Sequence, residues 1–167
     1  RRVGARVFVF DYRLGMEMAV RANGGRYASI KAGQATGLNP LWTETDARGT
    51  AWLSDWLGSL LHRSDKPLTP AQTNRIQEVV RQNATATDPA LRNWRDFASL
   101  FVSTDDNGDL HQRLIEWSED GRYGWLFGQS LEDTFSLEGD VVGFDLTGIL
   151  DSESERERMA VLSYLFR

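Results

Sequence analysis

The apolar positions near the N-terminus change from an unbroken run to a helical spacing. Residues 7–10 are Val-Phe-Val-Phe, which is typical of a strand covered on both faces, as in a parallel sheet flanked by helices. Asp11 ends this run. The apolar spacing over 14–22 predicts a helix. A Gly-Gly pair follows it, and glycine is common just after the end of a helix. A second strand is expected at 27–30, so the pattern predicts a strand-helix-strand unit.

Asp11 stands where the first expected strand meets the helix. In α/β sheets, ligands bind at the carboxyl ends of parallel strands, which makes Asp11 and the turn after it a candidate site. Asp is also a favoured residue just before helices. A plain capping or turn role for Asp11 therefore remains an alternative to catalysis.

From residue 43 to residue 118 the pattern predicts helices only. The first covers 46–61, and its apolar face carries residues at amphipathic spacing: Trp52, Trp56, Leu57, Leu60 and Leu61. Thr69, followed by Pro and with Gln at the third helical position, predicts the start of a second helix. A third is expected from Asp88 through Leu91 to Phe101, and a fourth is marked by Leu110, Leu114 and Trp117.

The aromatic stripes on these helices favour core packing, because amphipathic helices need apolar faces to dock. Aromatic side chains also stack on bases and peptides. An exposed Trp52 or Trp56 would therefore suggest a docking surface instead.

The last part of the chain returns to strand and helix. Residues 141–144 predict a buried strand ending at Asp145, and a Ser-Glu-Ser-Glu run caps a final helix. Asp145 lies near Asp11 if their strands are neighbours. The expected fold class is α/β, with a strand-helix-strand part at 1–42, an all-α insertion at 43–118 and a return to the sheet core at 119–167.

Composition narrows the class of protein. The chain has 167 residues and no Cys, so disulfides and thiolate metal sites are excluded. Its net charge of −5 does not support a broad basic surface for nucleic acid, although local basic patches remain an alternative. His62 and His111 have no partner at metal-ligand spacing. No apolar run approaches the ~20 residues needed to span a bilayer. The cytoplasmic side is the default expectation.

Four sequence blocks carry a family resemblance. They are VFVFDYRLGMEMAVRANGGRY at 7–27, GQATGLNPL at 33–41, DGRYGWLF at 120–127 and VGFDLTGILD at 142–151. In this order they resemble the C-terminal ATPase domain of the type IV secretion and conjugal transfer ATPases, the VirB-four and TrbE/CagE class. The chain departs from that family in two places: Tyr12 and Arg13 follow Asp11 where the family often has Lys and an acid, and Gly128 stands where an Asp is common.

The resemblance implies a partial RecA-like core from a protein that hydrolyses ATP with Mg²⁺. It also implies a hexamer at the cytoplasmic face of the bacterial inner membrane, which works with other secretion components in pilus biogenesis and substrate or DNA transfer. Asp11 and Glu17 are the eligible catalytic acids, and Arg122 is a candidate for reaching a neighbouring subunit's nucleotide. Stacking of Arg122 on Tyr123 or Trp125 is the structural alternative.

The phosphate-binding string G-x-x-x-x-G-K-[ST] does not occur in the chain. In the resembled family it would lie before Arg1, and the Walker B strand beyond Arg167. The chain alone is therefore expected neither to bind ATP tightly nor to hydrolyse it. The rival hypothesis is a non-catalytic module that docks partners through its helices. It expects exposed aromatic residues on 46–61 or 89–102 and no acid cluster at the strand ends.

Overall fold

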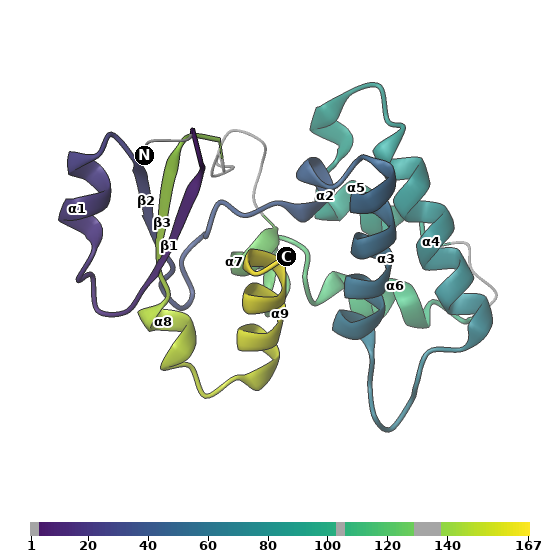
Figure 1. Ribbon diagram of the computed structural model, residues 1–167. Helices are drawn as coiled ribbons and strands as arrows, with labels where there is room; N and C mark the ends of the chain where they lie inside the picture. Colours follow the sequence, from purple (N-terminus) through teal and green to yellow (C-terminus); the bar gives the residue numbers. More distant parts are fainter. Residues whose placement is uncertain (1–3, 103–105, 129–137) are drawn as a thin grey trace.

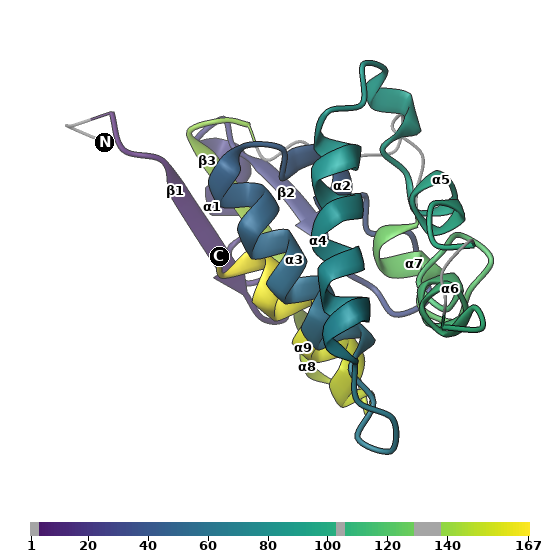
Figure 2. The same cartoon turned by 90° about the vertical axis from the view of Figure 1, so that its right-hand side faces the viewer.

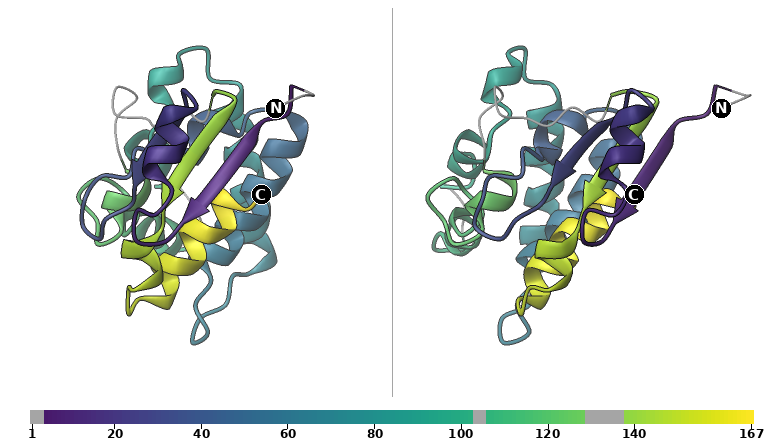
Figure 3. Two further views of the ribbon diagram at one scale, coloured as in Figure 1. Left: turned by 60° about the vertical axis from the view of Figure 1, so that its left-hand side comes forward. Right: turned by 90° about the vertical axis from the view of Figure 1, so that its left-hand side faces the viewer.

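The computed structural model describes residues 4–102, 106–128 and 138–167. Its sheet consists of three parallel strands, β1 (Val7–Asp11), β2 (Arg26–Ser29) and β3 (Val141–Asp145). Their order across the sheet is β1-β3-β2. The last strand along the chain thus lies between the first two, as the left view of Figure 3 shows. The expected α/β class with a parallel sheet is confirmed.

Helices cover both faces of this sheet. The short helix α1 (Glu17–Ala22) connects β1 to β2 and stands apart from the other helices (Figure 1). On the opposite face lies α9 (Glu155–Leu165), which follows α8 (Thr147–Leu150) and packs between the sheet and the helical part. The ring of Phe166, just after α9, lies 4.3 Å from that of Phe10 between centroids.

The segment between β2 and β3 is helical in its described residues. Its elements are α2 (Pro40–Thr43), α3 (Ala47–Leu61), α4 (Pro70–Ala84), the 3₁₀ helix η1 (Pro89–Leu91), α5 (Trp94–Ser99), α6 (Asp109–Ile115) and α7 (Gly124–Phe127). Helices α3 and α4 run side by side (Figure 2). The division of the chain at residues 42 and 118 stays a prediction.

The helix starts follow from local capping chemistry. Asp46 accepts a 2.6 Å hydrogen bond from the backbone N–H of Gly49 at the start of α3. At α4, Thr69 and Gln72 form the expected capping box: each side chain accepts a hydrogen bond from the other residue's backbone N–H, at 3.2 and 2.9 Å. These contacts satisfy backbone donors that a helix leaves without partners in its first turn.

Aromatic side chains fill the core of the helical part. In this part, the large rings with under 2% exposure are Trp94, Phe97, Phe101, Trp117 and Phe127. Trp56 is also buried, and its indole N–H donates to Ser163 Oγ on α9 at 2.9 Å. Trp52 is half-buried and stacks on Trp56 with 5.6 Å between ring centroids. The aromatic stripe therefore serves core packing, as the helical spacing predicted.

Three local predictions were wrong. Strand β1 is not covered throughout, because it lies at the sheet edge and leaves Val7 and Phe8 43% and 44% exposed. The first helix begins at Glu17 rather than at residue 14, since the preceding turn contains left-handed residues. The third expected helix is broken, because Asn93 is extended and caps α5 anew, while Leu91 is exposed.

Among the helices of the described residues, none combines the length and the apolar character needed to cross a bilayer.

Candidate active site at the strand ends

Two aspartates end neighbouring strands at the same edge of the sheet. Asp11 closes β1, Asp145 closes β3, and the two residues are direct partners in the parallel register. Ser29, at the end of β2, pairs with Asp145 from the other side. Both aspartates are buried, at 9% and 4% exposure. The carboxyl edge of the sheet thus collects acidic and hydroxyl side chains, which is the usual place for ligands in an open α/β sheet.

Three hydrogen bonds occupy the Asp11 carboxylate. Oδ1 accepts from the backbone N–H of Tyr12 at 2.8 Å, and Oδ2 accepts from the backbone N–H of Met16 at 2.7 Å and from the Tyr27 hydroxyl at 2.5 Å. The Tyr27 bond is the main cause that holds the pKa of Asp11 below its ordinary value, with the Met16 bond next. Asp11 is therefore an ionised anchor for the turn that follows it.

Asp145 is tied to the same turn from the neighbouring strand. Burial raises the pKa of Asp145, but hydrogen bonds from Thr147 and Ser29 outweigh burial, so that the pKa is lowered overall. Thr147 Oγ1 donates to Oδ1 at 2.5 Å and Ser29 Oγ to Oδ2 at 2.9 Å. The backbone of Leu14 also hydrogen-bonds this carboxylate.

The turn between β1 and α1 is held in an uncommon backbone conformation. Arg13 and Leu14 have φ values of 62° and 57°, in the left-handed region that non-glycine residues seldom adopt. The backbone N–H of Arg13 donates to Thr147 Oγ1 at 2.6 Å. Side chains from β1, β3 and α8 thus fix the path of this turn.

Glu17 is the first residue of α1 and emerges from this turn. Its side chain is 34% exposed, and Oε1 accepts from Arg21 Nε one helical turn later at 2.9 Å. A surface pair of this kind is weak and readily exchanged. Of the two acids proposed from the sequence, Glu17 is the accessible one and Asp11 the buried one.

Tyr27 reaches Asp11 only by crossing the central strand. Tyr27 on β2 is the register partner of Gly143 on β3, and a Cβ atom at Gly143 would lie 2.5 Å from the Tyr27 ring. The missing side chain therefore makes room for the ring. The apolar pattern does not single out Tyr27. Its signal in the sequence is a Tyr two residues before the end of a strand, on the face of the sheet that Asp11 shares.

Arg122 comes from a different element, the turn before α7. It is exposed, and its guanidinium lies over the Tyr123 ring at 5.3 Å from the centroid. Of the two alternatives for Arg122, stacking on Tyr123 is thus present in this chain. The structure does not place it among the groups that contact Asp11 or Asp145.

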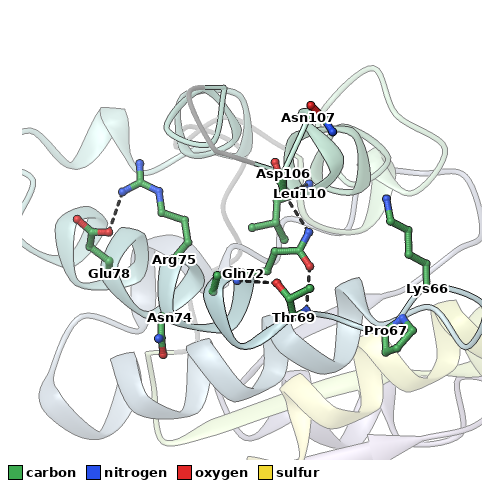
Figure 4. A pocket seen from close by; sticks show the side chains of 11 residues that line it. Lys66, Pro67, Thr69, Gln72, Asn74, Arg75, Glu78, Asp106, Asn107 and Leu110 are labelled. Carbon is green, nitrogen blue, oxygen red and sulfur yellow. Dashed lines mark hydrogen bonds and ion pairs between the residues drawn. The ribbon is translucent and has the colours of Figure 1, made fainter.

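The helical part contains a separate polar hollow of about 860 Å³ beside the start of α4 (Figure 4). Gln72 Nε2 donates to both Asp106 and Asp109 at 2.9 Å, and Lys66 pairs with Asp109 at 2.9 Å. These polar groups hold one another and join α4 to α6. We therefore assign them a structural role, and the strand-end edge remains the stronger candidate.

The rival docking hypothesis predicts exposed aromatic residues on the helices and no acid cluster at the strand ends, and the structure differs from both predictions. On 46–61, Trp56 is 5% exposed and Trp52 is half-buried, and on 89–102, Trp94 is 1% exposed. The strand ends do carry two aspartates in register. Both observations favour a site at the sheet edge.

The chain is similar in sequence to type IV secretion proteins from several bacteria. It is 28% identical over 158 residues to the type IV secretion system protein virB4 of Bartonella henselae, 29% over 154 residues to the protein virB4 of Agrobacterium fabrum, and 29% over 160 residues to the type IV secretion system protein PtlC of Bordetella pertussis. These alignments cover 94%, 91% and 92% of the chain, but only 20%, 19% and 19% of the relatives. The chain thus spans about a fifth of the length of the curated relatives it matches.

A solved structure has the same fold. The structure of VirB4 of Thermoanaerobacter pseudethanolicus superposes with a TM-score of 0.68 at 18% identity, over 98% of this chain and 49% of that one. No protein-family model matches the chain.

Proposed function

We propose that this chain, as a member of the VirB4 family of type IV secretion proteins, is a part of an ATPase that powers secretion or conjugation. The four sequence blocks and the relatives in three genera support this assignment. The part contributes the carboxyl edge of a RecA-like sheet. ATP hydrolysis is the activity of the whole protein in this proposal.

The single observation that supports the proposed chemistry is that Glu17 is more accessible than Asp11 and accepts fewer hydrogen bonds. A residue that orients water or takes its proton needs an accessible carboxylate with free acceptor capacity. Asp11 is buried, accepts three hydrogen bonds and has a lowered pKa. Glu17 is partly exposed and only weakly paired with Arg21. We therefore assign the catalytic role to Glu17 and a supporting role to Asp11.

The residues of this chain fit only part of a nucleotide site. ATP hydrolysis of this kind uses Mg²⁺ and a phosphate-binding loop to neutralise charge on the transferred group. The 167 residues contain no such loop, and the Asp11 oxygens already have donors. Glu17 is the more accessible of the two acids, and its one printed partner is Arg21. The chain alone should neither bind ATP tightly nor hydrolyse it.

The assembly is a further part of the proposal. By its family, the whole protein forms a hexamer at the cytoplasmic face of the inner membrane and contacts other secretion components. The exposure of Arg122 is compatible with reaching a neighbouring subunit, although its stacking on Tyr123 gives it a local role already. The net charge of −5 offers no support for a broad nucleic-acid surface.

The test compares carboxamide variants in the full-length natural protein. Glu17→Gln should lower kcat by about 100-fold or more, the usual range for a general base, while a fluorescent ATP analogue binds as before. The matched control is Glu78→Gln, an exposed acid on α4 that also pairs with an Arg, and it should leave kcat unchanged. Wild-type turnover in Glu17→Gln would overturn the assignment.

A second measurement uses the isolated chain. Mg²⁺-dependent ATPase activity of residues 1–167 in a clean preparation, lost on Glu17→Gln, would contradict the view that the chain is one part of the site.

A further inference from the structure

We propose that the free edge of β1 is a pairing surface for a further parallel strand, which the segment following α9 supplies in the longer protein. This rests on one part of the proposed function, that the chain is a part of a longer VirB4-family protein, and not on the assignment of a catalytic residue. Among the described strands, β1 pairs only with β3. Figure 3 shows β1 at the outer side of the sheet, with the C-terminal end of the chain beside it.

Half of the backbone groups of β1 point away from β3. The Val7 N–H donates to the Asp140 carbonyl at 2.8 Å, on the side of β3. Alternate residues of a parallel strand bond to the same neighbour, so the N–H and C=O groups of Phe8 and Phe10 face the open edge. A row of such groups is a template for pairing with another strand.

The residues of β1 are typical of a strand with a neighbour on each side. Natural edge strands discourage further pairing with charged side chains, Pro or bulges. Before its last residue, β1 reads Val-Phe-Val-Phe, and its register with β3 has no bulge. By contrast, β2 at the opposite edge is a four-residue strand that begins with the exposed Arg26. The composition therefore marks β2 as an edge and β1 as an interior strand.

A hollow lies beside β1 on each face of the sheet. On the α9 face, Phe8, Phe10 and Phe166 line a hollow of about 340 Å³. On the α1 face, Val7 and Val9 line one of about 250 Å³. Successive side chains of a strand point to opposite faces, so a strand at this edge would direct one row of side chains toward each hollow. The occupant is therefore an apolar strand that is covered on both faces.

The handedness of strand connections indicates which segment this strand comes from. Helices α1 and α9 lie on opposite faces of the sheet (Figure 1). The connection from β1 through α1 to β2 passes across β3. Connections between parallel strands are right-handed in about 98% of cases, so a connection on the opposite face runs in the opposite direction. From β3 through α9, that direction leads past β1 to its free edge.

The end of the described chain already lies near this edge. The ring of Phe166 is 4.3 Å from that of Phe10 between centroids, and Leu165 lines the same hollow as Phe8. Loops between a helix and the next strand commonly have about 2–6 residues. A strand that begins soon after residue 167 therefore needs no long connection to reach β1.

Hydrogen exchange in the full-length natural protein tests whether this edge is paired. The amides of Phe8 and Phe10 should exchange at least about 100-fold more slowly than those of an unstructured peptide of the same sequence, as paired strand amides do. The Val9 amide, which faces β3 in either case, is the internal reference. Protection of Val9 alone, with open-edge exchange at Phe8 and Phe10, would overturn the proposal.

A proline substitution gives a second readout. Phe8→Pro removes an N–H that a true edge strand does not need, whereas Phe8→Leu removes the ring alone. In the full-length protein, the Phe10 amide should exchange about tenfold faster in Phe8→Pro than in Phe8→Leu, because a ladder hydrogen bond is lost next to it. Equal exchange in the two variants would contradict pairing at this edge.

Cysteine cross-linking identifies the occupant. The 167 residues contain no Cys, so Phe8→Cys can be combined with a Cys at successive positions of the first apolar run after residue 167, in full-length protein whose other cysteines are replaced. Neighbouring strands bring such residues within reach of a disulfide. A cross-link to this run within one polypeptide supports the proposal. A cross-link to the segment before residue 1, a cross-link between two molecules, or none at any position overturns it. These outcomes do not depend on the activity of Glu17→Gln, so the two proposals can fail separately.

Discussion

The Tyr27 hydroxyl on β2 donates a 2.5 Å hydrogen bond to Asp11 on β1, across the central strand β3. The ring lies over Gly143, the one residue type that leaves room for it there. This side-chain hydrogen bond thereby connects β1 and β2 across one face of β3, the strand that separates them. The bond also occupies Asp11 Oδ2, which agrees with the supporting role that we propose for Asp11.

Tyr27→Phe should destabilise the fold, because the ring still fits while Asp11 loses the donor that most lowers its pKa. A hydrogen bond to a charged group stabilises more than one between neutral groups, so the loss should exceed that of a surface tyrosine hydroxyl. Urea titration at neutral pH measures the difference. The matched control is Tyr12→Phe, since the Tyr12 hydroxyl bonds Asp151 at the surface and its removal should cost under ~0.5 kcal/mol. Equal losses in both variants would contradict the special role of the buried bond.

Gly143→Ala should displace the Tyr27 ring, because the new Cβ would lie 2.5 Å from it and 3.0 Å from Val20 on α1. Overpacking of this kind costs about 1–3 kcal/mol. Gly58→Ala is the comparison: Gly58 lies inside α3 with nothing within 4 Å of a new Cβ. There, Ala should stabilise by about 0.5–1 kcal/mol. Opposite signs in thermal melts are the expected result, and stabilisation by both would show that the ring can move freely.

The two strand-end aspartates predict a loss of stability in acid. Both have lowered pKa values, Asp11 mainly through the Tyr27 bond and Asp145 through bonds that outweigh burial. The unfolded chain, with ordinary values near 3.8, takes up protons first as the pH falls. Their contribution is therefore present above the unfolded pKa and is lost as pH falls through the lower folded values.

Urea midpoints measured from neutral pH downward should fall below about pH 4. Asp145→Asn removes one of the two groups and should show a lower neutral midpoint and a shallower fall. An unchanged slope in the variant would mean that other acids determine the acid response.

Arg113 should be more important to stability than any exposed arginine pair. It is fully buried, donates to the carbonyls of Leu61 and Lys66, and pairs with Asp109 at 2.8 Å. Arg113→Ala leaves those acceptors buried and should cost about 3–5 kcal/mol. Arg95→Ala removes a pair at the surface, with a cost of about 0–1 kcal/mol. Chemical denaturation of both variants checks the ranking.

Local chemistry made much of the fold predictable. The capping box at Thr69 and the Asp46 cap specify where two long helices begin, because they depend on residues only three positions apart. The strand ending at Asp145 was also identified from its apolar run. The corrections have local causes as well: Asn93 offers a cap that interrupts the third helix, and two left-handed residues delay the first.

The candidate site was only half predictable. Asp11 and Glu17 were visible as acids after a strand, but their different burial depends on partners far away in the sequence. The Tyr27 ring crosses a glycine on β3, and Thr147 reaches the turn from α8. Strand order is decided by pairing over long separations, so a single sequence does not reveal which hydroxyl meets which carboxylate.

The order β1-β3-β2 has a consequence for how the chain folds during synthesis. Among the described strands, β1 and β2 pair only with β3, which follows Ser29 by 116 residues in the case of the Asp145 contact. The helices between them can form first from local contacts, whereas the sheet must wait for a distant partner. Of the features in the described residues, the acid edge should therefore assemble after the helices that separate β2 from β3.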